Sequence, residues 1–161
     1  MTTTDPYTVR RPSRSRFITV RGLRHHVLEW GDDSMVTPEK LRPQLFGERP
    51  AAEALVAERG GEVVAFALFF TNFSTFLAQP GLYLEDLYVK PEHRGAGIGE
   101  ALLKRLAQLA VERGCGRFEW SVLDWNENAI RFYERMGATV MPEWRICRVT
   151  GDALQAMGEA A

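Results

Sequence analysis

The sequence is poor in the features that mark several common protein classes. Of its 161 residues only Cys115 and Cys147 are cysteines, and they match no metal-binding or redox spacing. No apolar run approaches the roughly 20 residues of a membrane span. The start, Met1 to Arg16, is polar and rich in Arg and Ser, unlike the apolar centre of a secretion signal. We therefore expect a cytoplasmic chain with neither structural disulfides nor a bound metal.

An excess of charge of either sign is also missing. Lys and Arg number 20 and Asp and Glu number 21, which gives a net charge of −1. This balance argues against a nucleic-acid or membrane-surface partner. Six Arg make the first thirty residues locally basic, and we interpret this stretch as a solvated, partly loose arm. With 45% apolar residues, the chain can bury the core of one domain.

Residues 1–15 are expected to form a flexible tail and residues 16–161 a single domain, whose positions 16–33 form a hairpin. Thr37 or Ser34 is placed to cap a helix that begins at Pro38. The pair Gly60-Gly61 supplies the positive φ angles of a tight hairpin turn. The elements predicted for this half are strands 17–20 and 25–30, a helix near 38–45, and strands 54–58 and 62–70.

The second half alternates strands and helices. Its helix Glu100–Arg113 has leucines at the helical period and ends at Gly114. The other predicted elements are strands 82–89, 117–123 and 143–149 and a helix 129–136, followed by a short tail. This alternation indicates an α/β sheet with helices packed on its faces.

A glycine-rich turn separates the strand 82–89 from the helix that begins at Glu100. It reads Arg94-Gly95-Ala96-Gly97-Ile98-Gly99. Glycines at alternate positions let successive backbone N–H groups point at one anion, where the helix dipole adds its positive end. The turn lacks the Gly-Lys-Ser/Thr of nucleotide-triphosphate loops and the spacing of a dinucleotide fingerprint. A pyrophosphate is the natural guest, and a connector without a ligand is the alternative.

Two carboxylates, Glu85 and Asp86, interrupt the apolar strand Leu82–Val89. Burying a charge is costly unless it is paired or serves a site. A regular strand would point the two to opposite faces, whereas a β-bulge could turn both and splay the strand from its neighbour. Two solvated acids on an edge strand are the less favoured interpretation, because apolar residues flank both sides.

A third segment is the helix that follows Asn126 or Asn128, either of which can cap it. Helical spacing places Tyr133 inward, on one face with Ala129, Ile130 and Met136. Alone, this pattern is most simply a core tyrosine with a satisfied hydroxyl.

Together these three segments resemble the GNAT superfamily of N-acetyltransferases. Arg94-x-x-Gly97-x-Gly99 is similar to its coenzyme A signature, and the Asn126–Ala138 helix segment to its second cofactor-binding segment. Tyr83–Val89 and Asp124–Glu127 look like the spermidine/spermine (diamine) and thialysine acetyltransferases. The resemblance begins near Met35. It implies a mixed, mostly antiparallel α/β sheet with flanking helices and a splayed strand pair that holds acetyl-CoA.

The resemblance also implies the site. On this resemblance, an amine would attack the thioester directly, Glu85 would accept its proton through water with help from Asp86, and Tyr133 would protonate the leaving thiolate. The acceptor would be a small cationic primary amine bound by Glu85, Asp86, Trp120 and Glu143. The implied cofactor contacts are Leu87, Tyr88, Val89, Arg94, Gly95, Ala96, Gly97, Ile98, Gly99, Glu100, Asn126, Asn128, Ala129 and Tyr133.

The first thirty-odd residues depart from the family, which normally opens with a strand and two helices that wall the acceptor pocket. A replaced or fused N-terminus is the hypothesis. The acceptor could be a polyamine, a lysine analogue or an aminoglycoside-like amine, and a catalytically silent coenzyme A-binding or oligomerisation module is the alternative. The resemblance implies a homodimer. A hydrolase would need a G-x-S-x-G elbow, which the sequence lacks.

Overall fold

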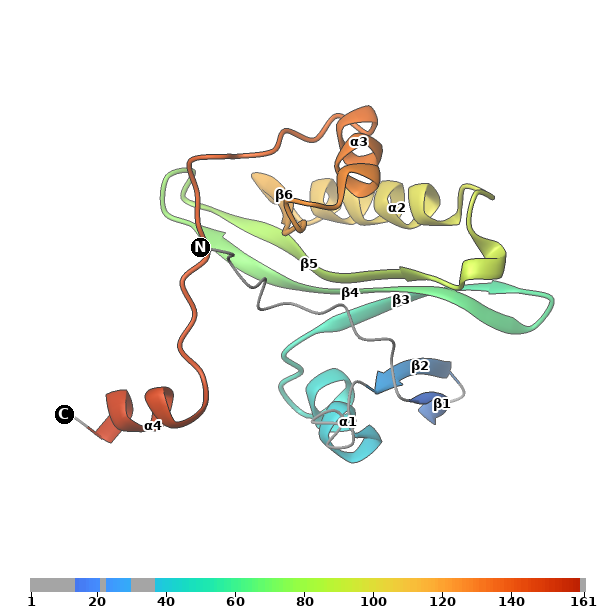
Figure 1. The fold of residues 1–161 in the computed structure, drawn as a ribbon, viewed down its shortest axis with the longest axis horizontal. Coiled ribbons are helices and arrows are strands. Elements are labelled where there is room, and N and C mark those ends of the chain that lie inside the picture. The colour runs from blue at the N-terminus through green and yellow to red at the C-terminus, as the bar shows by residue number, and fades with distance from the viewer. Residues whose placement is uncertain (1–13, 21–22, 30–36, 160–161) are drawn as a thin grey trace, which may run out of the picture. The chain divides into compact units, whose positions relative to one another are not determined.

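The computed structural model describes residues 14–20, 23–29 and 37–159, with side chains from residue 37 onward (Figure 1). The chain divides into two compact parts, residues 1–121 and 122–161. No helix in the described ranges is both long enough and apolar enough to cross a membrane.

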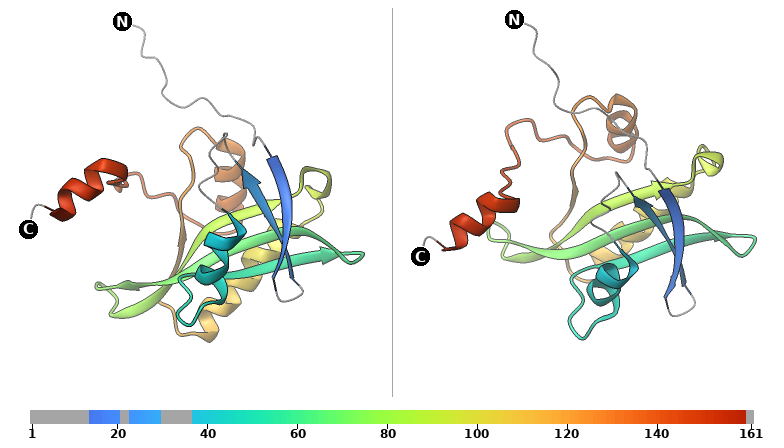
Figure 2. Two further views of the ribbon diagram at one scale, coloured as in Figure 1. Left: turned by 90° about the horizontal axis from the view of Figure 1, so that it is seen from below. Right: turned by 60° about the horizontal axis from the view of Figure 1, so that its bottom comes forward.

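The first part is built on a four-stranded sheet in the order β3-β4-β5-β6, seen from two further directions in Figure 2. Its strands are β3 (Glu53–Arg59), β4 (Glu62–Ser74), β5 (Gln79–Val89) and β6 (Arg117–Trp120). The first three pair antiparallel, and β6 joins β5 in parallel. Gly60 (φ 60°) and Gly61 (φ 81°) make the two-residue turn between β3 and β4. The predicted mixed, mostly antiparallel sheet is confirmed.

Helix α2 (Ile98–Glu112) packs along one face of this sheet (Figure 1). Its apolar positions recur at the helical period, so one side of the helix is buried and the other solvated. The side chains that form the shared core are Leu102, Leu103, Leu106 and Ala110 of α2 and Ala65, Ala67, Phe69, Leu82 and Leu84 of the sheet. Arg113, the C-cap, bonds both carboxylate oxygens of Glu53 on β3, at 2.5 and 2.7 Å. The predicted helix is confirmed.

Two further elements precede the sheet. Strands β1 (Arg14–Val20) and β2 (Leu23–Glu29) pair antiparallel as a separate two-stranded sheet. These are the two strands predicted for this stretch. Of the tail predicted for residues 1–15, positions 14 and 15 belong to β1, and positions 1–13, like the turn at 21–22, lie outside the described residues. Helix α1 (Pro38–Phe46) begins as predicted, with the Thr37 hydroxyl accepting from the Lys40 N–H at 3.3 Å.

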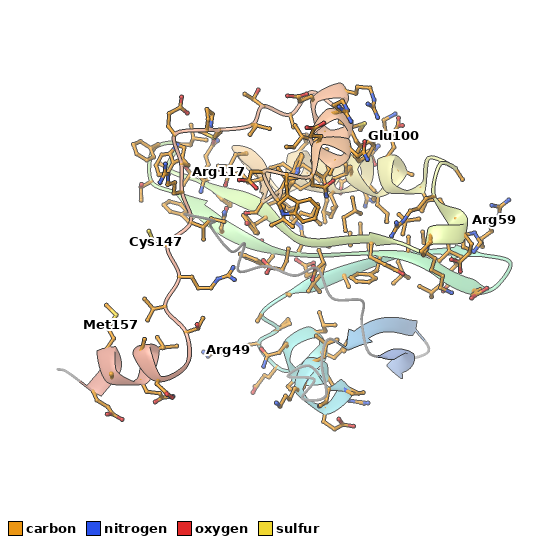
Figure 3. All side chains as sticks on the ribbon, viewed as in Figure 1. Arg49, Arg59, Glu100, Arg117, Cys147 and Met157 are labelled. Atoms are coloured by element: carbon orange, nitrogen blue, oxygen red, sulfur yellow. The ribbon has the colours of Figure 1, made fainter. Side chains whose placement is uncertain are left out.

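The second part holds α3 (Glu127–Arg135) and α4 (Gly151–Glu159). The predicted final strand at 143–149 is wrong, because residues 138–150 form neither helix nor strand, and α4 replaces the expected short tail. A strand needs a partner for its backbone groups, and alternation alone supplies none. Every residue from 139 to 159 is exposed, including Cys147 and Met157 (Figure 3).

Candidate active site

A β-bulge interrupts β5 at the two acids. The pairing runs Phe69↔Leu84 and then Leu68↔Asp86, so Glu85 has no partner on β4. One extra residue on one strand bends that strand and increases its twist. The bulge predicted at this position is therefore present. Both acids are exposed, whereas Leu84, the residue before them, is buried.

Strands β5 and β6 part at the same place. Their parallel register runs from Gly81↔Arg117 to Leu84↔Trp120 and ends there. Beyond it, β5 continues through Glu85–Val89 paired to β4 alone. The ladder with β6 therefore does not reach Leu87, Tyr88 and Val89, which lie on the part of β5 that extends past the end of β6. An extended ligand with amide groups could pair there as an added strand.

The bulge also sorts the side chains of β5 between the two faces of the sheet. Leu84 lies opposite Phe69, whose ring is covered by the Arg113 guanidinium of α2 at 5.8 Å. Tyr83 packs on Phe70 (5.1 Å) and Tyr88 on Phe66 (5.8 Å), so both tyrosines occupy the face opposite α2, here called the far face. Asp86 pairs with Leu68 and shares that face.

Asp86 is the acid whose environment changes its chemistry. Although the residue as a whole is exposed, its carboxyl is partly desolvated, and this desolvation raises the pKa of the carboxyl above the ordinary value of 3.8. The neighbouring charge of Glu85 raises the same pKa further. A carboxylate with a raised pKa is a stronger base, as proton abstraction near neutral pH requires.

The glycine-rich turn after β5 forms an uncapped helix start. Gly95 (φ 75°) and Gly97 (φ 77°) adopt left-handed conformations, and Gly97 is the N-cap of α2 without any side-chain cap. The first helical bond runs from Ala101 N to Gly97 O (2.9 Å), so the N–H groups of Ile98 and Gly99 precede the ladder. No atom lies within 4 Å of a Cβ built on Gly95 or Gly97. Exposed donors and open space fit a pyrophosphate.

Arg94 ties this turn back to β5. Its Nε donates to the Val89 carbonyl at 2.9 Å, and its guanidinium lies 5.9 Å from the centre of the Tyr88 ring. Arg94 therefore connects the glycine-rich turn to the end of β5 through its side chain. Glu100 follows in the first turn of α2 (Figure 3), bonded to Lys104 at 2.7 Å.

In the second part, α3 presents Tyr133 as predicted. Asn126 caps the helix, its Oδ1 accepting from Ala129 N at 3.2 Å. Asn128 instead accepts from Arg131 at 2.9 Å. The half-buried side chains of α3 are Ala129, Ile130, Phe132 and Tyr133. Burial raises the pKa of the Tyr133 phenol above its ordinary value of 10.0, so this group keeps its proton at neutral pH.

One predicted acceptor residue, Trp120, lies on the opposite face of the sheet from Asp86. Trp120 lies opposite Leu84 in the register and packs on Phe118 at 4.9 Å, on the face that α2 covers. Glu143 is exposed in the irregular segment before α4. Neither a lone aromatic residue nor a lone acid reveals from sequence which face it will occupy.

Two residues near the opening were missed as site residues. The Tyr83 hydroxyl lies 2.7 Å from the Ser121 hydroxyl, directly beyond the last residue of β6. The only sequence signal was the position of Tyr83 three residues before Asp86, which places both on one face only if the strand contains a bulge.

A sheet that opens between two parallel strands, beside a carboxylate pair and a glycine-rich helix start, is the architecture of coenzyme A-dependent N-acyltransferases. Residues 23–138 match the model of the acetyltransferase (GNAT) family, and the chain belongs to that family. The resemblance inferred from the sequence is thus confirmed.

Relatives with assigned activities support this placement. L-ornithine N5-acetyltransferase of Arabidopsis thaliana is 50% identical over 112 residues, covering 68% of this chain and 49% of that protein. Thialysine N-epsilon-acetyltransferase of Sus scrofa is 38% identical over 135 residues, covering 77% of this chain and 79% of that protein. This chain therefore spans about half of the plant relative, as the 49% coverage shows.

A solved structure agrees with the fold. An integron cassette protein from the mobile metagenome of V. cholerae superimposes with a TM-score of 0.71 at 28% identity, covering 81% of this chain and 83% of that one.

Proposed function

We propose that the protein transfers the acetyl group of acetyl-CoA to a primary amine of a small cationic acceptor. One observation carries the proposal: β5 leaves β6 at the residue where its bulge presents Glu85 and Asp86, and it then runs into the uncapped start of α2. An extended binding edge, a base and an anion site follow one another along a single stretch of chain.

The thioester would supply an activated acetyl group, and the chain would supply its binding. Backbone amides of Gly95–Gly99 would hold the pyrophosphate, with the positive end of the α2 dipole behind them. The edge of β5 at Leu87–Val89, past the end of the β6 ladder, would take the pantetheine arm, and a backbone N–H on this edge would polarise the thioester carbonyl. In the second part, Asn126, Asn128 and Ala129 are proposed to complete the cofactor contacts.

The acids are proposed to accept the proton of the amine. Alkyl amines have a pKa of about 10.4, so under about 0.1% is neutral at pH 7. Glu85 is the base implied by family resemblance, and its exposure suits a relay through water. The raised pKa of Asp86 supports a direct role for Asp86 in accepting the amine proton, beyond assisting Glu85. Both charges also attract a cationic acceptor.

Tyr133 is proposed as the acid that protonates the departing thiolate. Burial keeps its phenol protonated at neutral pH, and a phenol is a competent general acid.

The acceptor class and the assembly complete the proposal. Ornithine and thialysine, the amines in the relatives' names, carry a primary amine on a short flexible chain, as polyamines do. We also propose that the protein is a homodimer and that it acts in the cytoplasm. The exposed apolar residues after α3 support the dimer, and the free cysteines Cys115 and Cys147 are compatible with a reducing compartment.

The test is steady-state thiol release from acetyl-CoA with ornithine, thialysine, lysine, spermidine and putrescine as acceptors. We expect turnover with at least one amine. If acetyl-CoA binds but no amine reacts, the chain is a silent coenzyme A-binding module and the proposed transfer is wrong.

A matched pair of glycines tests the cofactor cradle. Gly97→Ala and Gly60→Ala both force alanine into a left-handed conformation with open space around its Cβ. Only Gly97 lies at the start of α2. We expect Gly97→Ala to weaken acetyl-CoA binding about tenfold or more, and Gly60→Ala to leave it unchanged, in calorimetric titrations. Equal effects would contradict this location of the cradle.

A further inference from the structure

We infer that the hydroxyl pair of Tyr83 and Ser121 sets how far β5 and β6 open, and so positions the edge that receives acetyl-CoA. This role rests on the proposed function and adds two positioning residues to it. Neither side chain needs to touch the reacting atoms.

The place of the pair along the strands is the first argument. The backbone ladder between β5 and β6 ends at Leu84↔Trp120. Ser121 is the next residue after that pair on one side, and Tyr83 is the residue before it on the other. Their 2.7 Å hydrogen bond therefore ties the two chains together at the point where the ladder stops. Beyond this tie β6 has ended, and β5 continues through Glu85–Val89 with β4 as its neighbour.

Residues packed around Tyr83 fix the orientation of its ring, so that its hydroxyl can bond Ser121. The ring packs on Phe70 of β4 at 5.1 Å, which keeps the phenol on the far face. Across the register lies Glu119, whose carboxylate lies 2.8 Å from Arg117 Nε and 3.4 Å from the Asn72 amide that donates to it. That carboxylate is already engaged, and Ser121 offers the hydroxyl that meets the phenol.

The consequence for function follows from the geometry of an opening. The tie lies where β5 and β6 separate, so its loss moves the β5 edge at Leu87 relative to the end of β6 at Trp120. Small displacements of a binding edge are costly, because an ordered ligand must meet several donors at once.

The experiment is a double-mutant cycle with Tyr83→Phe, Ser121→Ala and the combined variant. Tyr83→Phe keeps the ring on Phe70 and removes only the hydroxyl. We expect each single variant to weaken acetyl-CoA binding by calorimetry, and to lower kcat/KM for acetyl-CoA, by about fivefold, because the displaced β5 edge meets the ligand less well. The combined variant should be no worse than either single variant, since one bond is removed in all three.

Controls separate positioning from general stability. Ser121→Thr, which retains the hydroxyl, should restore binding, and Thr75→Ala, which removes an exposed hydroxyl in the β4–β5 turn, should change nothing. The KM for the amine should stay within about twofold of the wild-type value, and the melting temperature should hold in every variant.

Each other outcome overturns the inference. Additive single effects, or unchanged acetyl-CoA binding, show that the pair does not set the opening. A changed amine KM with unchanged acetyl-CoA binding shows that the hydroxyls contact the acceptor instead. Failure of the proposed function is distinguishable from these, because a wild-type protein that binds acetyl-CoA without turnover still completes the cycle on binding alone. If the wild-type protein does not bind acetyl-CoA, both the proposed function and the role of the hydroxyl pair are wrong.

Discussion

The ionised carboxylate of Asp86 is expected to lower the stability of the fold while it serves the reaction as a base. Its pKa is raised, so the folded chain holds this proton more tightly than the unfolded chain does. Once Asp86 is ionised, at pH above its raised native pKa, it therefore costs stability. The penalty disappears below the ordinary value of 3.8, where the carboxyl is protonated in both states.

Asp86→Asn should therefore separate the two properties. We expect kcat/KM to fall about 10- to 100-fold, because a base is removed, while the melting temperature rises slightly at pH 7 and is unchanged near pH 3. Asp152→Asn, which neutralises an exposed acid on α4, is the control for charge and should alter neither. A destabilised Asp86→Asn protein at pH 7 would show that the carboxylate is a structural partner.

Tyr133→Phe tests the general acid. The change removes one hydroxyl from a half-buried ring that packs beside Phe132 at 5.4 Å. We expect kcat to fall about 100-fold, with KM for acetyl-CoA little changed. The raised pKa also predicts that wild-type activity lasts to higher pH than an ordinary phenol, with its value of 10.0, would allow. An unchanged kcat would assign the proton to water.

At the scale of elements, a forked ion pair between Arg113, the C-cap of α2, and Glu53 connects this helix to the edge strand β3. The carboxyl of Glu53 has a lowered pKa, first because the Arg113 side chain bonds it and then because of the charge of Arg113. Stabilisation by this pair is complete above the ordinary value of 4.5 and is lost as pH falls through the lower native pKa.

Glu53→Gln should measure this attachment. We expect a loss of about 0.5 kcal/mol at pH 7 in chemical denaturation, modest because both side chains are partly solvated. The loss should vanish in acid. Glu112→Gln breaks the exposed Arg105–Glu112 pair (2.9 Å) within α2 and should cost less. If both variants lose the same free energy of unfolding, the Glu53–Arg113 pair stabilises the protein no more than an exposed ion pair does.

Local physics explains which elements could be predicted from the sequence. The period of α2, the glycine pair at 60–61 and the Thr37 cap all depend on neighbours in the chain, and all are confirmed. The strand at 143–149 had the right alternation but depended on a partner that sequence spacing does not specify. For the same reason the bulge could be anticipated at the acids, whereas the Tyr83–Ser121 bond, across 38 positions of sequence, could not.

At the scale of the whole molecule, the described C-terminal segment exposes several large apolar side chains. Between residues 139 and 159 no side chain is buried, and Trp144 and Ile146 are each 69% exposed. Large apolar side chains gathered in one exposed stretch are a common feature of protein–protein interfaces. This feature gives physical support to the homodimer that family resemblance implies.

Light scattering after size exclusion tests the assembly. We expect a mass of twice the 18.2 kDa of one chain, and a shift toward 18.2 kDa in the double variant Trp144→Ser/Ile146→Ser, with dimer affinity reduced about tenfold or more. Val111→Ser removes another apolar side chain, 79% exposed on α2, and should leave the mass unchanged. A monomeric wild-type protein at micromolar concentration would contradict the dimer.

The bulge at Glu85 has a consequence for how such a site can arise. On either side of it every residue of β5 keeps a regular partner on β4, from Leu84↔Phe69 to Asp86↔Leu68, and the alternation of faces is the same as if Glu85 were absent. The gain or loss of one codon would therefore insert or remove the kink without moving any core side chain to the wrong face. A continuous sheet and an opened one are a single genetic step apart.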